Sequence, residues 1–274
     1  MEKNRNKGKK TVKLSEIKLE YLKGSPVDGK TARSALTFMG SLLMMAIAFL
    51  LLGMAMMMDN AVLRVAFNGC LIAAALLMFF QTGAGQGAVA VNLGEMLYDR
   101  RQSGGKVTAK EQKACYHPLK GLITALLGSI PVVVAALVLA LVAQRQMTAL
   151  GALPSWVSAF EGRTEIGSAV AYYHQPAALT VEDVLRVIIR VLMMPLVNIV
   201  NPYGADALLT LERLSPLVMM VPALAYGVGY TQGVRARKQV HAGIAEGEIK
   251  RKKKEKRQRK AQQRRVPKGP EQLN

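Results

Sequence analysis

Residues that bind metals or act as nucleophiles are scarce in this sequence. It has 3 histidines and 2 cysteines among 274 residues, and neither a His-Glu-x-x-His nor a Cys-x-x-Cys spacing occurs. Metal or nucleophilic chemistry needs several such side chains gathered at one place. His117, His174 and His241 instead fall in three separate polar stretches. We therefore expect no metal site, no cofactor and a protein that is not an enzyme.

Charge is also missing, over runs long enough to cross a membrane. Residues 37–58 and 121–143 contain no charged side chain, and residues 61–81 contain only Arg64. As a helix, each run crosses the ~30 Å hydrocarbon core of a bilayer. A fourth apolar stretch covers about residues 215–232. The sequence therefore predicts an all-α fold, a polytopic integral membrane helical bundle with four spans.

The 37 basic residues are unevenly distributed. Residues 1–34, 83–120 and 233–274 together hold 31 of them, whereas residues 144–213 hold five basic and six acidic side chains. Lys and Arg accumulate in the cytoplasmic loops of membrane proteins. We therefore predict a multi-pass protein of the cell membrane with both termini in the cytoplasm. It has a basic arm, a transmembrane domain (35–232) with a cytoplasmic loop, and a basic tail.

One further apolar stretch, residues 184–200, conflicts with this topology if it spans the membrane. Both ends of the region around it lie on the cytoplasmic side, so the number of crossings must be even. Arg186 and Arg190 place charge in its first turns, and Pro195 interrupts it. An arginine at the centre of a span costs ~2.5–3.5 kcal/mol. We therefore predict an amphipathic or re-entrant helix at the outer surface, within an external region of residues 144–213.

The charged residues of this segment are our candidate site for a substrate or lipid. In one interpretation, the arginines face a shared cavity and bind an anionic group, with two asparagines deeper in the same site. In the other, which we favour, the charged stripe of an interfacial helix faces water, where charge costs little. The candidate residues are Glu182, Asp183, Arg186, Arg190, Asn198 and Asn201.

Two local patterns in the apolar region also lead to predictions. Arg64 and Asn68 lie one turn apart, either as a buried polar site or, as we favour, with the arginine reaching out to the membrane interface. Gly83, Gly85 and Gly87 follow the second apolar run. We expect these glycines to bend the chain where it leaves the bilayer.

The cytoplasmic loop also carries a helix signal. Thr108 and Glu111 have the spacing of a capping box, which predicts a short helix after a turn at Ser103-Gly104-Gly105.

The tail has the densest charge in the chain. Such a run repels itself, so we expect disorder or a frayed helix until it meets an anion. Anionic phospholipid headgroups attract Lys or Arg at a surface by ~1 kcal/mol each, and RNA phosphates suit the same side chains. Residues 233–274 contain no aromatic side chain for base stacking, so we expect no sequence-specific binding of nucleic acid. A solvated tail that only fixes topology is the third interpretation. The candidate contacts are Lys250, Arg251, Lys252, Lys253, Lys254, Lys256 and Arg257.

These features favour a non-enzymatic integral membrane protein. We interpret it as a small permease subunit or an accessory scaffold of a membrane assembly, in contact with the bilayer and with other membrane subunits. The alternative is an insertase-like or ribosome-associated factor that is tethered through its basic tail. A permease predicts a polar cavity near the middle of the bilayer, whereas a scaffold predicts a dry bundle.

Overall fold

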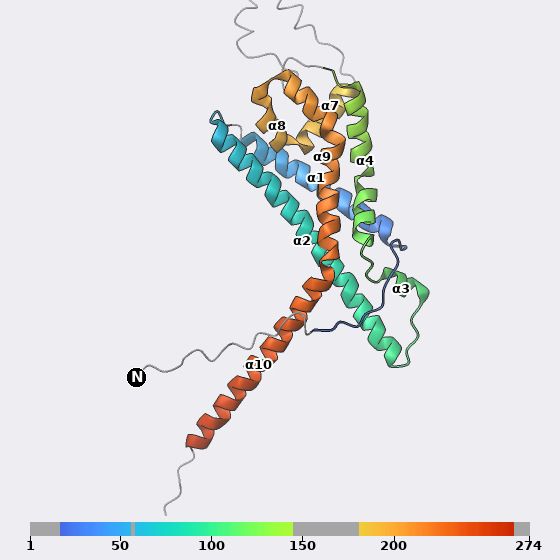
Figure 1. Cartoon of the computed structure of the whole chain (residues 1–274), viewed down its shortest axis with the longest axis vertical. Coiled ribbons are helices and arrows are strands. Elements are labelled where there is room, and N and C mark those ends of the chain that lie inside the picture. Colours follow the sequence, from blue (N-terminus) through green and yellow to red (C-terminus); the bar gives the residue numbers. More distant parts are fainter. Residues whose placement is uncertain (1–16, 56–57, 145–180, 266–274) are drawn as a thin grey trace, which may run out of the picture.

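The computed structural model describes residues 17–55, 58–144 and 181–265, and these residues form helices joined by short connections (Figure 1). Residues 145–180 of the predicted external region lie outside the described residues. The elements in chain order are α1 (Thr31–Ala55), α2 (Ala61–Gln102), α3 (Ala109–Ala114), α4 (Lys120–Val142), α7 (Val181–Leu192), α8 (Met194–Val200), the 3-10 helix η3 (Asn201–Tyr203), α9 (Ala205–Thr231) and α10 (Gly233–Arg265).

Four of the described helices are long and apolar enough to cross a membrane, namely α1, α2, α4 and α9. Each covers most of one of the apolar runs seen in the sequence, because side chains that face hydrocarbon cannot carry charge cheaply. The prediction of an all-α membrane bundle with four spans is therefore confirmed. Two helices extend well beyond the predicted limits: α2 continues 21 residues past residue 81 to Gln102, and α9 begins ten residues before the predicted span.

Residues 184–200 form two short helices instead of a span. Helix α7 has 12 residues and α8 has 7, with a break at Met193 and Pro195 in the first turn of α8. Neither helix reaches across a bilayer at ~1.5 Å per residue. The prediction of a helix that does not span is confirmed, and the proline predicted to interrupt the segment lies at the break.

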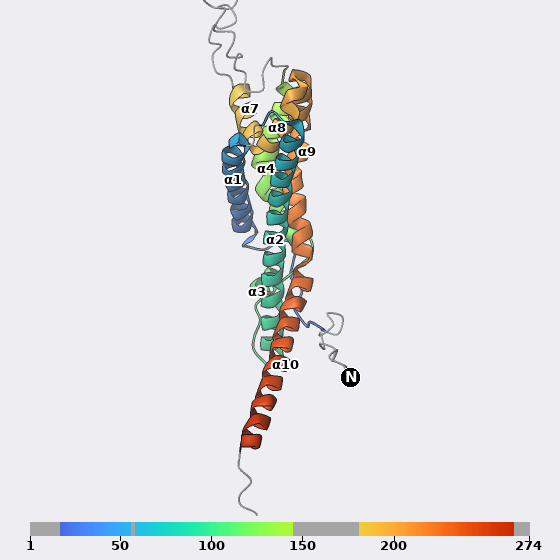
Figure 2. The same cartoon turned by 90° about the vertical axis from the view of Figure 1, so that its left-hand side faces the viewer.

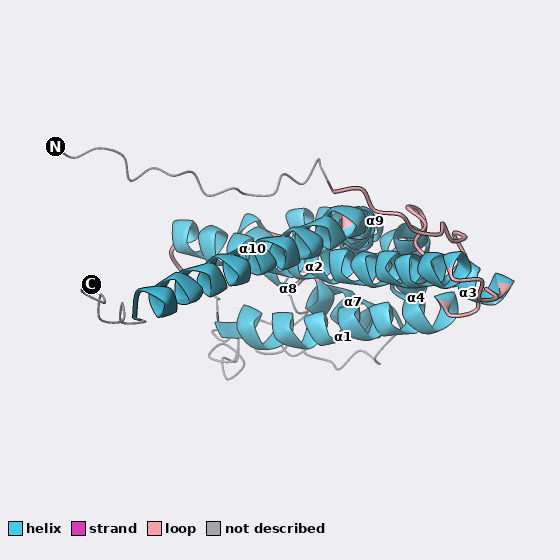
Figure 3. Ribbon diagram, turned by 90° about the horizontal axis from the view of Figure 1, so that it is seen from below, coloured by secondary structure: helices cyan, strands magenta, loops and turns pink. Residues whose placement is uncertain are grey.

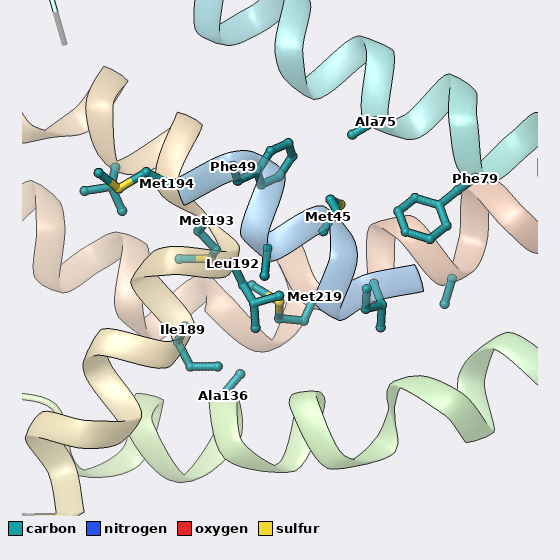
Figure 4. Packing of buried hydrophobic residues seen from close by; sticks show 14 of the residues in the cluster. Met45, Phe49, Ala75, Phe79, Ala136, Ile189, Leu192, Met193, Met194 and Met219 are labelled. Carbon is teal, nitrogen blue, oxygen red and sulfur yellow. The ribbon is translucent and has the colours of Figure 1, made fainter. Parts of the chain in front are cut away.

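The core of the bundle is apolar and is closed by α7 and α8. Helix α9 packs against α4 and α2, while α1 packs against α4, α7 and α8. Figure 4 shows side chains from these helices meeting, among them Ile189 and Met193 of the α7–α8 segment and Met219 of α9. Viewed from below, α1 and α10 lie at the two sides of the assembly and α2 runs between them (Figure 3). The short helices thus complete the core at one end of the bundle.

Four glycines bring α2 into close contact with the chain at the α9–α10 junction. Gly83 and Gly87 lie one turn apart on α2; Gly87 contacts Gly233, Gly83 lies against the backbone of Tyr226, and Gly229 lies against the backbone of Phe80. A Cβ added at Gly83 or Gly229 would collide with a backbone carbonyl oxygen of the other helix. Pairs of small residues at this spacing let membrane helices cross closely. The prediction that Gly83, Gly85 and Gly87 bend the chain is therefore wrong, because α2 continues unbroken to Gln102.

Residues 233–265 of the tail form a continuous helix, where we expected disorder or a frayed helix. Helix α10 begins at Gly233, two residues after α9 ends, and continues to Arg265. It leaves the bundle as a single rod in both side views (Figures 1 and 2). Lys, Arg, Glu, Gln and Ala, which make up residues 250–265, are all strong helix formers. Their intrinsic preference outweighs the mutual repulsion on which the prediction of disorder rested.

The basic arm and the loop meet at the end of the bundle where α10 leaves, which we call the basic end. The amide of Leu22 donates to the Gly94 carbonyl at 3.1 Å, and that of Gly24 donates to the Tyr116 carbonyl at 2.9 Å. Thr108 and Glu111 form the predicted capping box at the start of α3. The other end of the bundle, which carries α7, is called the α7 end below.

Candidate functional site

The two arginines of α7 bind one carboxylate on α9. Arg186 Nε donates to Glu212 Oε1 at 3.1 Å and to Oε2 at 3.2 Å, and Arg190 Nε donates to Oε1 at 2.7 Å. The exposed fractions are 4% for Arg186, 5% for Arg190 and 2% for Glu212. These three residues form a buried ion cluster that fastens α7 to α9.

The remaining donors of Arg186 are directed at neighbouring acceptors. Its Nη2 atom donates to Glu182 Oε1 at 2.6 Å and to the Gln144 carbonyl at 3.0 Å. Its Nη1 atom lies 3.8 Å from Asp183 Oδ1, one turn earlier on the helix. Of the six candidate residues, the structure brings these four together: Glu182, Asp183, Arg186 and Arg190.

Burial of the arginines contradicts the favoured interpretation of this segment. A stripe that faced water would expose Arg186 and Arg190, but both lie inside the bundle. Burial lowers the pKa of the Arg190 guanidinium, and the Glu212 carboxylate opposes this shift. An isolated buried charge is so costly that such groups are paired. The cluster therefore holds the fold together, with Glu182 and Asp183 nearer to the surface.

Asn198 belongs to a different polar cluster. Its Nδ2 atom donates to the Gly53 carbonyl at 2.8 Å and to Asn68 Oδ1 at 3.2 Å. Asn68 is fully buried and donates to the Arg64 carbonyl at 2.8 Å. Asn68 is thus in a buried polar site on α2, as in the interpretation that we did not favour, whereas Arg64 is only half-buried and donates to the Met58 carbonyl at 3.0 Å. Asn201 is half-buried in η3 and does not join either cluster.

Glu212 is not among the candidate residues from the sequence, because it lies just before the apolar stretch of residues 215–232. A helical pattern would have found it, because Leu208, Glu212, Ser215, Met219 and Pro222 are all buried and follow one face of α9. The spacing of three or four residues marks one side of a helix. A carboxylate on that side needs a buried cation as its partner.

A nucleotide-binding pattern in the sequence does not form a nucleotide site. Residues 24–31, Gly-Ser-Pro-Val-Asp-Gly-Lys-Thr, fit the P-loop spacing. A P-loop needs a strand before it, and residues 17–23 form none. At the start of α1, the Asp28 carboxylate accepts hydrogen bonds from the Lys30 amide and the Thr31 hydroxyl, both at 2.9 Å. The chain's own carboxylate thus takes the position that an anion would occupy.

A second ion pair fixes the basic end. Lys120 Nζ lies 2.6 Å from Asp28 Oδ2, and it also donates to the carbonyls of Lys113 and Ala114 at 3.2 and 3.1 Å. Burial raises the pKa of the Asp28 carboxyl, but hydrogen bonds from Lys120 and Thr31 outweigh it, so the pKa is lower than its ordinary value. This pair joins the arm to the start of α4.

Helix α10 is held to α2 just beyond the glycine crossing. Arg237 Nε donates to Glu95 Oε2 at 2.8 Å, and His241 Nε2 lies 3.2 Å from Glu95 Oε1. The rings of Tyr116 and Tyr230 stack at 5.5 Å beside this contact region, and the Tyr116 hydroxyl donates to the Thr231 carbonyl at 3.2 Å. The base of α10 is therefore fixed on several sides.

Beyond this base, the predicted tail residues stand away from the bundle. All seven candidate residues from Lys250 to Arg257 are exposed. Within this stretch only Glu255 is acidic, and it accepts a hydrogen bond from Arg251 at 3.3 Å. The cations are thus presented to the surroundings, in contrast to the buried pair on α7.

Among the described residues, no group of three His, Cys, Asp or Glu side chains is close enough together to hold a metal ion. The comparisons add no relative: no protein family, curated protein or solved structure matches this chain.

Proposed function

We propose that this chain is a non-enzymatic scaffold of a membrane assembly that holds a stiff basic helix in the cytoplasm for docking of structured RNA, as on a ribosome. The skewed distribution of Lys and Arg supports the cytoplasmic placement of the basic end. The observation that carries the proposal is the continuation of α9 into α10, with its exposed cations.

The arrangement of charge on α10 favours a polyanion over a flat membrane surface. Nine of the eleven residues from 250 to 260 are Lys or Arg and none is apolar, so every face of the helix is cationic. A helix that lies on a bilayer needs an apolar face to bury. RNA phosphates instead attract cations from several sides, and the affinity arises from release of counterions. Without aromatic side chains, this contact is independent of base sequence.

The position of the charges supports the same partner. Lys250 follows Gly233 by seventeen residues, which is ~25 Å of helix. The rod points away from the bundle (Figures 1 and 2). Electrostatic attraction between exposed charges is largely screened beyond ~8 Å at physiological salt. A projecting helix therefore holds its cations beyond the reach of lipid headgroups at its base.

The interior of the bundle supports a scaffold over a permease for polar solutes. A cavity of about 210 Å³ between α1, α2, α8 and α9 is lined by apolar side chains, including Met45, Phe49 and Met219. The buried arginines and asparagines described above are bonded within the protein. Such a lining does not replace the hydration of a polar solute.

The test is salt-titrated binding of purified ribosomes to the full-length protein in nanodiscs. One variant replaces Lys252, Lys253, Lys254 and Lys256 by Gln, and a control variant removes the same charge at Arg100, Arg101, Lys106 and Lys110. We expect the α10 variant to lose affinity and to flatten the salt dependence by ~0.7–0.9 per lost phosphate contact. The control should change little.

The other interpretations give different results. Equal loss in both variants indicates attraction to net charge alone and contradicts docking on α10. Loss of binding to anionic liposomes, with ribosome binding absent from the unmodified protein, indicates a lipid contact. Binding to neither partner leaves a tail that only fixes topology.

A further inference from the structure

The first two membrane helices do not pack against each other along their length. Helix α1 packs against α4, α7 and α8, whereas α2 packs against α9 and α10. They meet at Phe38 and Phe79, whose ring centroids are 5.5 Å apart. The two helices line two cavities, one on each side of this contact. The cavity towards the α7 end has a volume of about 210 Å³, and the cavity towards the basic end has a volume of about 120 Å³.

The residues of α1 and α2 that line one or the other cavity follow one face of each helix. We call these two facing surfaces together the α1–α2 track. On α1 they recur every three or four residues from Ser34 to Phe49, ~22 Å of helix. In Figure 4, Met45 and Phe49 of α1 are directed towards the part of α2 that carries Ala75 and Phe79. The lining residues are Ser34, Thr37, Phe38, Ser41, Met45 and Phe49 on α1, and Ile72, Ala75, Leu76, Phe79, Thr82 and Gln86 on α2.

The track changes in polarity along its length. Its half towards the α7 end is apolar, whereas the half towards the basic end carries four hydroxyl groups and the amide of Gln86. Ser41 follows Arg33 by eight residues and Thr82 precedes Glu95 by thirteen, so both lie well inside uncharged helix. Lipid chains offer no hydrogen bond to such groups.

Three of these four hydroxyl groups can only accept further hydrogen bonds. Thr37 donates to the Arg33 carbonyl at 3.0 Å, Ser41 to the Thr37 carbonyl at 3.1 Å, and Thr82 to the Met78 carbonyl at 2.8 Å. A hydroxyl has one proton and two lone pairs. With the proton bonded to its own helix, each group leaves acceptor positions for an occupant of the track.

We propose that the α1–α2 track docks a transmembrane helix of a partner protein. That helix carries a hydrogen-bond donor side chain, such as Asn or Gln, in the half nearest the basic end and is apolar in the other half. A phospholipid does not fit, because its donors lie in the headgroup at the interface and its chains have none. The site extends the proposed scaffold role by naming a membrane partner, and it does not depend on RNA binding.

The probe is a set of synthetic transmembrane peptides of Leu and Ala, added to vesicles that contain the full-length protein. One peptide carries a single Gln in its basic-end half, one carries N,N-dimethylglutamine there, and one carries neither. The dimethylated side chain keeps the acceptor and loses both donors. Binding is measured by energy transfer from a label on Cys70, which is exposed whereas Cys115 is buried.

We expect the Gln peptide to bind about threefold to tenfold more tightly than the other two, the range for one hydrogen bond between membrane helices. The triple variant Thr37→Val, Ser41→Ala, Thr82→Val should bind all three peptides equally. The matched control is Thr210→Val, because Thr210 makes the same type of bond, to the Asp206 carbonyl at 2.9 Å, outside the track. Thr210→Val should keep the preference.

Three results would overturn the proposal. In the first, the unmodified protein binds the three peptides with equal affinity. In the second, Thr210→Val abolishes the preference for the Gln peptide as fully as the triple variant does. In the third, energy transfer between copies of the chain is lost in the triple variant, which makes the track an interface between copies. Ribosome binding is measured on the same preparation, so that failure of the track and failure of the RNA contact are told apart.

Discussion

The two ends of the bundle use arginine and lysine in opposite ways. At the α7 end, Arg186 and Arg190 are buried and share the Glu212 carboxylate. On α10, beyond the basic end, the residues from Lys250 to Arg257 are exposed. Buried cations contribute to the fold only while they are paired, and exposed cations contribute little to it. The first group is therefore structural, and the second is available for a partner.

The contrast between the buried arginines of α7 and the exposed cations of α10 predicts its largest effect at Glu212. The substitution Glu212→Gln leaves two arginines without their shared anion, and we expect the free energy of unfolding to fall by about 3–5 kcal/mol. Denaturant unfolding in detergent micelles measures it. Replacing Lys252, Lys253 and Lys254 by Gln should change it by less than about 0.5 kcal/mol.

A rescue variant separates pairing from shape at the same site. If Arg186→Met, Arg190→Met and Glu212→Leu are combined, most of the lost stability should return, because apolar side chains of similar volume replace a buried ion cluster well. Continued instability of this variant would mean that the cluster also positions groups by hydrogen bonds that methionine cannot replace.

The glycine crossing is the next test, with an intermediate effect. The substitution Gly229→Ala places a Cβ against the Phe80 carbonyl oxygen, and we expect a loss of about 1–3 kcal/mol from overpacking. Gly85→Ala is the matched control, because nothing lies within 4 Å of the added carbon. It should be neutral or slightly stabilising, since alanine favours helix. Equal loss in both variants would contradict the close crossing.

The contact of Glu95 with α10 should affect the position of α10 more than the free energy of unfolding of the protein. The substitution Glu95→Gln removes the ion pair with Arg237, which is partly exposed, so we expect a loss of about 1 kcal/mol or less. Spin labels at positions 99 and 250 should show a broader distance distribution, because the base of α10 then loses its contacts with Glu95 and is held by the crossing and by Tyr116. An unchanged distribution would assign the rigidity to the glycines and Tyr116 alone.

The smallest expected effect is the pH dependence of the Asp28–Lys120 pair. Because the folded state lowers the pKa of Asp28, its contribution is present above the unfolded pKa of ~3.9 and is lost as the pH falls through the lower, folded value. The melting temperature of Asp28→Asn should therefore lie below that of the unmodified protein at pH 6. The gap should close as the pH is lowered below about 4. A gap that is constant down to pH 2.5 would contradict this assignment.

The membrane spans were predictable from sequence because hydrocarbon excludes charge from whole runs of residues. The partner of Arg186 was not, because a pattern on one helix does not say which carboxylate of a distant helix it meets. Glu212 marked the end of an apolar run, while the buried face of α9 continued past it. For the tail we predicted disorder or a frayed helix, because repulsion between its charges was weighed above the helix preference of Lys, Arg and Gln.

The glycine crossing also sets where the two long helices of the molecule diverge. Helices α2 and α9–α10 touch most closely at the glycines and separate on both sides of this contact (Figure 1). On one side, α10 carries its exposed cations away from the bundle. On the other side, α2 forms one wall of the α1–α2 track. The two surfaces proposed for different partners thus diverge from one contact, which residues without side chains make possible.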